Sequence, residues 1–149
     1  MTSPSRGVPV GRRLEVSVAL APPSFTFPSS YTTLISLAEL PAVSPIFWLL
    51  QLDKGVENWT EILREQYPER VLVPFAKDRR TDDVFCFDGN DHSGNPAVIL
   101  IHSFTDPGWE YQGEWLHFDS WLSGLIEFHE EWERTGDAEL EPPRTDAGT

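Results

Sequence analysis

The sequence predicts an α+β fold, in which a mostly antiparallel sheet of about four to six strands is flanked by helices. Three short runs of apolar, β-branched and aromatic residues follow one another at 71–76, 84–87 and 97–104, and the polar segments between them leave no room for a helix. Two longer segments, at 56–67 and 120–134, instead carry apolar residues at helical spacing. A length of 149 residues suits one such domain.

The strongest strand signal is the run AVILIHSF at 97–104, because its residues are apolar on both alternating faces. A strand of this kind lies in a sheet that is covered on both sides. An earlier run, IFWLLQL at 46–52, indicates a buried strand, although a helical turn also fits it. The segment SFTDPGWEYQGEW at 103–115 reads as a loop, whose Pro107–Gly108 dipeptide forms a turn.

The helix boundaries follow from residues that favour helix ends. Pro28 suits the first turn of a helix, and apolar residues at helical spacing follow it. Asp119 or Ser120 is expected to cap the last helix, and Gly136 to stop it.

Composition divides the chain into three parts. Residues 1–24 hold four prolines around one alternating apolar piece, so we expect a flexible N-terminal arm, with an edge strand at 14–18 as the alternative. Residues 25–135 form the single domain. Residues 136–149 are expected to be a disordered acidic tail.

The net charge of −13 comes from 24 acidic and 11 basic residues, and most of it falls at 78–134. Such a field repels nucleic acid and anionic lipid and attracts basic partners, so direct binding of nucleic acid or membranes is not expected. Arg12 and Arg13 precede a short apolar stretch in the manner of a secretion signal, but Glu15 interrupts it. We therefore expect a cytoplasmic protein.

The residues offer no catalytic motif, and we expect neither an enzyme nor a cofactor. Cys86 is the only cysteine, which excludes an internal disulfide and a cysteine-based metal site. The four histidines lack the spacing of a zinc site, so no metal is expected. The acidic loop that begins at Asp88 has neither the glycine nor the final glutamate at the positions that a calcium loop requires.

A series of short motifs resembles a known family. LVPFAKD, DDVFCFD, VILIH, DPGWE and HFDSWL occur in the order seen in the SUKH superfamily, which contains the fungal Smi/Knr cell-wall regulators and many bacterial immunity proteins. The resemblance covers about a third of the chain, at 67–122, and extends loosely to a Pro-x-x-Tyr start at Pro28 and Tyr31. The glycine-rich turn that usually follows this start is replaced by LAELPAVSP.

The resemblance implies a protein-binding module, namely an immunity protein that neutralises a cognate toxin, of the nuclease type or another, by binding and occluding it. The alternative is a regulatory or scaffold protein of the same fold without a toxin partner. In both cases the partner is a protein, and the acidic charge favours a basic toxin domain.

Five residues of the acidic module are the candidate partner-binding residues, because an aromatic anchor among acids suits a basic partner. They are Asp82, Asp83, Asp106, Trp109 and Glu110. The alternative is structural: acids at strand ends bind loop amides, and Trp109 packs on the sheet.

Overall fold

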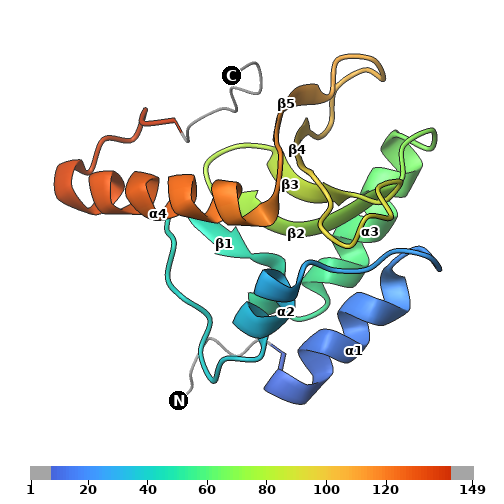
Figure 1. Ribbon diagram of the computed structural model, residues 1–149. Helices are drawn as coiled ribbons and strands as arrows, with labels where there is room; N and C mark the ends of the chain where they lie inside the picture. Colours follow the sequence, from blue (N-terminus) through green and yellow to red (C-terminus); the bar gives the residue numbers. More distant parts are fainter. Residues whose placement is uncertain (1–7, 142–149) are drawn as a thin grey trace.

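The computed structural model describes residues 8–141 and confirms the α+β fold. Five strands and four α-helices make up this part of the chain (Figure 1). In chain order the elements are α1 (Val10–Leu20), α2 (Ser29–Ile35), β1 (Ile46–Trp48), the short 3₁₀ helix η2 (Leu49–Gln51), α3 (Gly55–Gln66), β2 (Leu72–Asp78), β3 (Asp83–Asp88), β4 (Val98–His102), β5 (Tyr111–Trp115) and α4 (Phe118–Thr135).

The sheet is a meander in which each strand pairs antiparallel with the next one in the sequence, in the order β1-β2-β3-β4-β5. The expected strands at 71–76, 84–87 and 97–104 correspond to β2, β3 and β4. The run at 46–52 divides into β1 and η2, so both interpretations of it hold in part. Pro74 lies in a central strand, at an irregularity in the pairing of β2 with β3, where a proline is tolerated.

Strand β5 corrects the expectation of a continuous loop at 103–115. Its sequence, YQGEW, lacks an alternating apolar pattern because β5 is an edge strand and most of its residues are exposed or half-buried. Its partner β4 supplies the apolar residues of the pair.

The two faces of the sheet are covered by different helices (Figure 1). The larger core lies under α2 and α4, and it is largely aromatic: the rings of Phe75 and Phe87 stack at 4.3 Å, and Phe118 and Trp121 of α4 pack against Phe75. The smaller core lies under α3, whose Leu63 meets the other face of β3 and β4. Coverage on both sides explains why β4 is apolar on both of its faces.

The N-terminal segment was expected to be a flexible arm, but its described part is mostly helical. Residues 10–20 form the helix α1, so neither the edge strand at 14–18 nor a loose segment describes this part, while residues 1–7 lie outside the described residues. The alternating apolar residues of this segment divide between the two sides of the helix, because Val16 is buried whereas Leu14 and Val18 are exposed.

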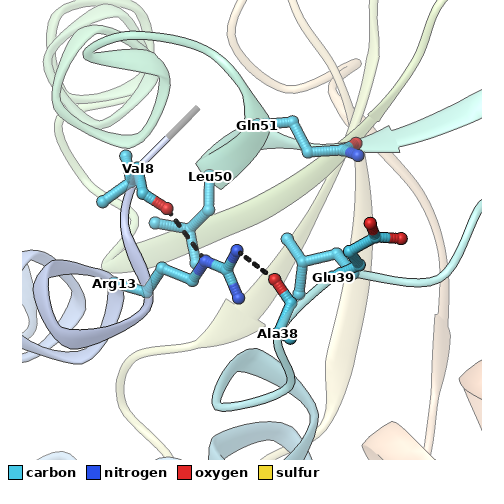
Figure 2. Close-up of a pocket in the computed structure, with 7 residues that line it drawn as sticks. Val8, Arg13, Ala38, Glu39, Leu50 and Gln51 are labelled. Carbon is cyan, nitrogen blue, oxygen red and sulfur yellow. Dashed lines mark hydrogen bonds between the residues drawn. The ribbon is translucent and has the colours of Figure 1, made fainter. Parts of the chain in front are cut away.

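Arg13 fixes α1 to the domain. Its guanidinium group donates to the backbone oxygens of Val8, Ile35 and Leu37 at 2.7–3.0 Å, so it caps the carboxyl end of α2 from another helix. Figure 2 shows its hydrogen bonds to the oxygens of Val8 and Ala38. Basic side chains are favourable at that end of a helix. This contact joins residues 22 positions apart, which local sequence patterns do not reveal.

The start of the C-terminal segment also differs from expectation, because it is bound to the domain rather than disordered. The guanidinium group of Arg80 donates to the backbone oxygens of Ala138 and Leu140, and Leu140 packs against the larger core. Residues 137–141 are therefore held against the domain, whereas 142–149 lie outside the described residues.

The ends of α4 differ slightly from the expected ones. The helix begins at Phe118 with His117 as its N-cap, so neither Asp119 nor Ser120 is the capping residue. Gly136 ends the helix in the left-handed conformation, at φ 64°, as expected.

Candidate functional site

Four of the five candidate residues lie exposed or half-buried at one end of the sheet. The turn between β2 and β3 and the loop between β4 and β5 meet there, because β2 and β4 end where β3 and β5 begin. The two segments are joined by Ser103, whose backbone N–H and hydroxyl both donate to the backbone oxygen of Asp82, at 2.9 and 2.7 Å. We call this region, 79–83 and 103–110, the acidic end.

The acids of this end differ in what their carboxylates bind. Asp83 lies opposite His102 in the pairing of β3 with β4, and its Oδ1 is 2.8 Å from Nδ1 of His102. Asp82 and Asp106 are exposed, and within residues 8–141 no hydrogen bond or ion pair engages their carboxylates. Both carboxylates therefore lie at the surface without a hydrogen-bond partner, and the charge of Asp82 acts on the nearby Lys77.

Glu110 was expected to lie at the binding surface, but it is buried, since only 6% of the residue is exposed. Its carboxylate forms an ion pair with Arg70 and accepts a 2.6 Å hydrogen bond from the backbone N–H of Gly108. Burial raises the pKa of the Glu110 carboxyl, but these hydrogen bonds and the charge of Arg70 outweigh burial and hold it below its ordinary value. Glu110 thus anchors the loop from beneath.

Trp109 has the opposite environment from its neighbour. It is 73% exposed, so it does not pack on the sheet. Its backbone N–H donates to the oxygen of Asp106 across the Pro107–Gly108 turn, at 3.0 Å. The loop therefore presents a large aromatic surface beside a free carboxylate.

A second exposed aromatic residue, Phe104, was not among the candidates. The sequence places it at the end of the strand at 97–104, but β4 ends at His102 and Phe104 is 64% exposed in the loop. The one sequence feature that indicates exposure of Phe104 is its position between a strand and the TDPG turn.

Hydrogen bonds from α3 and from the residue that follows it hold the β4–β5 loop in place. The hydroxyl of Tyr67 donates toward the backbone oxygens of His102 and Thr105, at 2.9 and 3.2 Å. The side-chain oxygen of Gln66 accepts a 2.6 Å hydrogen bond from the N–H of Phe104. The exposed aromatic residues therefore stand on a fixed backbone rather than on a loosely held one.

Arg13 and Cys86 support the fold rather than a site. The cavity beside Arg13 measures about 340 Å³, and the guanidinium group donates to the backbone oxygens of Val8 and Ala38, which line it (Figure 2). Cys86 is fully buried, and burial raises the pKa of its thiol. The described residues contain no group of three His, Cys, Asp or Glu side chains arranged as metal ligands.

Comparisons with known proteins give no relative. No protein-family model matches the chain, and neither the curated proteins nor the solved structures contain a match to it. None of the helices within residues 8–141 has the length and apolar character that a membrane crossing requires.

Proposed function

We propose that the protein is a non-catalytic binding module that recognises a basic protein partner through its acidic end. The observation that carries the proposal is Trp109, which is 73% exposed next to the free carboxylate of Asp106 on a loop fixed by hydrogen bonds. Exposed tryptophans are costly in water and are over-represented among the residues that dominate binding energy. Glu110 supports this surface from within, and the other four candidates border it.

The SUKH-like motifs at 67–122 favour one role for such a module, that of an immunity protein which occludes a cognate toxin in the cytoplasm. A nuclease-type toxin must present Lys and Arg to bind phosphates. The aspartates of the acidic end offer that surface negative charge in place of a nucleic acid, and long-range attraction raises the rate of association. Trp109 adds the desolvated contact that slows dissociation.

A hydrolytic function is less well supported by the geometry. Asp83 and His102 form a pair of the kind that activates a nucleophile, and Ser103 follows directly. The Ser103 side chain is fully buried, however, and its hydroxyl donates to the oxygen of Asp82 instead of to the imidazole. We therefore infer that the Asp83–His102 pair is structural and holds β3 to β4.

The test begins with the neighbouring genes, and a toxin domain encoded there is the probe. Co-expression with the wild-type protein should protect cells from that domain, and the purified pair should bind more weakly as salt is raised. Trp109→Ala should weaken binding roughly tenfold or more. Leu116→Ala is the matched control, because Leu116 is equally exposed, at 68%, but follows β5 at the opposite end of the sheet.

Three results would count against this proposal. Binding that is insensitive to salt and unchanged in Trp109→Ala would place the interface elsewhere. Absence of a neighbouring toxin gene would favour the scaffold role over immunity. Turnover of a small substrate that vanishes on changing His102 would overturn the non-catalytic assignment.

A further inference from the structure

Phe104 adopts a backbone conformation that its own side chain disfavours. Its φ is 61°, in the left-handed region where a bulky residue is strained and where glycine or asparagine is at ease. Its ring is 64% exposed, so burial returns little of this strain energy. Apart from one edge-to-face contact with Trp59, the fold gives no reason for a phenylalanine at this position, and residual strain of this kind gathers at functional sites.

Two residues of α3 hold Phe104 in this conformation. The side-chain oxygen of Gln66 accepts the 2.6 Å hydrogen bond from the Phe104 N–H. The ring of Trp59 meets the Phe104 ring edge to face, with centroids 6.1 Å apart. Trp59 and Gln66 are seven residues apart and thus lie on one side of the helix. The ring of Phe104 is therefore positioned in advance of any contact with a partner.

The end of the sheet that carries this aromatic pair also carries acidic side chains, which favour a cationic partner. Asp82 and Asp106 belong to the two loops that meet at this end of the sheet, and no hydrogen bond or ion pair within the described residues engages their carboxylates, although the charge of Asp82 acts on Lys77. The nearby cation is Lys77, whose ammonium group lies 5.5 Å from the centre of the Trp59 ring. That group donates to the backbone oxygens of Asp78 and Thr81, so it is directed into its own turn.

We propose that Phe104 is the apolar anchor of the partner-binding surface and that Gln66 is the residue that positions it. The surface then extends from the β4–β5 loop to the outer side of α3. The partner that fits it is a protein or peptide segment with an apolar pocket or side chain bordered by Lys or Arg. This inference rests on the proposed function, since it concerns the same end of the sheet, but it assigns the anchor to a different residue and names its support.

Stability provides the first test, because it needs no partner. Phe104→Asn relieves the strained backbone and removes a ring that is mostly in water, so the thermal midpoint should stay unchanged or rise by about 2–4 °C. Leu116→Asn, a matched change at an exposed residue, should leave the midpoint unchanged. A fall of several degrees in Phe104→Asn alone would show that the ring supports the fold, and it would overturn the inference.

Binding provides the second test, with a library of random twelve-residue peptides displayed on phage as the probe. Selection on the wild-type protein should enrich peptides in which Lys or Arg flank an apolar residue. Synthetic forms of these peptides should bind Phe104→Asn roughly tenfold more weakly or worse, and Leu116→Asn as tightly as the wild type.

Gln66 is tested by removal and rescue. Gln66→Ala removes the acceptor for the Phe104 N–H and should weaken peptide binding several-fold, whereas Gln66→Glu retains an acceptor oxygen and should restore it. A loss caused only by damage to the helix would not be restored in this way.

The outcomes separate this inference from the proposed function. Peptides that bind Phe104→Asn as tightly as the wild type, or a selection without enrichment, would overturn the role of Phe104 and leave the toxin test of Trp109 intact. A toxin that fails to bind, together with peptides that depend on Phe104 and Gln66, would remove the immunity role and leave this surface in place.

Discussion

The acidic end and the loop between β3 and β4 lie at opposite ends of the sheet and both carry aspartates, but they use these acids differently. In the β3–β4 loop, Asp91 accepts hydrogen bonds from the backbone N–H groups of Ser93 and Ala97, at 3.0 and 3.2 Å. Asp88 accepts one from Asn90, at 2.9 Å. This loop therefore satisfies its own backbone with its own carboxylates.

In the β4–β5 loop of the acidic end, the backbone is held instead by Tyr67 and Gln66, which lie outside the loop, and by the buried Glu110. The carboxylates of Asp82 and Asp106 accept no hydrogen bond from the backbone of the described residues, although the charge of Asp82 acts on Lys77. The comparison shows that acidic composition alone does not indicate a binding surface. What distinguishes the two loops is whether the carboxylates are engaged and whether aromatic side chains stand exposed beside them.

The largest expected effect concerns the anchor of the acidic end. Glu110→Ala leaves Arg70 without its partner and Gly108 without an acceptor, so it should lower the free energy of unfolding by about 2–4 kcal/mol. Chemical denaturation measures this change. Asp106→Ala, on the same loop, should stay within about 0.5 kcal/mol of the wild type. Equal losses in both variants would remove the distinction between buried and free acids.

The opposite loop should lose stability without losing binding. Asp91→Ala removes two hydrogen bonds to the backbone and should cost about 1–2 kcal/mol of unfolding free energy. Its affinity for the toxin or for the selected peptides should equal that of the wild type, in a titration at a temperature where both are folded. A marked loss of affinity in Asp91→Ala would show that the partner also reaches this end of the sheet.

The free acids should show the reverse behaviour. Asp82→Asn with Asp106→Asn should leave unfolding unchanged and lower the association rate roughly threefold at low salt, because surface charges act mainly by steering. The difference should disappear at high salt, as screening requires. Stopped-flow or surface-binding kinetics at two salt concentrations measure it. A slower association that persists at high salt would argue for direct contacts instead.

The smallest expected effect is in the pH dependence of stability. Hydrogen bonds hold the pKa values of Asp91 and Glu110 below their ordinary values of 3.8 and 4.5. Carboxyls of this kind contribute stability above the ordinary pKa and lose it as the pH falls through the folded value. Denaturation from pH 6 downward should therefore weaken the wild type more steeply than Asp91→Asn or Glu110→Gln. Parallel curves would contradict these pKa shifts.

Much of the fold follows from local patterns. The helix at 56–67, the strands at 71–76 and 84–87 and the last helix occur close to their expected positions, because apolar spacing reports directly on which side of an element is buried. The candidate site is partly predictable as well: turn and strand signals place Asp82 and Asp106 at strand ends. Sequence reasoning could not separate Glu110 from Trp109, since both belong to the same DPGWE motif.

The sequence by itself therefore determines the α+β class, the order of the elements apart from α1 and β5, the excess of acid and the turn at Pro107–Gly108. The tertiary structure decides what depends on partners distant in the chain. Arg13 orders α1 only because it reaches carbonyl oxygens of α2, and Glu110 is buried only because Arg70 lies 40 residues away in the sequence but beside it in space. The backbone of Phe104 is held by Gln66, which lies 38 residues earlier in the sequence. Such contacts join residues that are far apart in the sequence. Local sequence patterns do not reveal them, and they form only once the chain is folded.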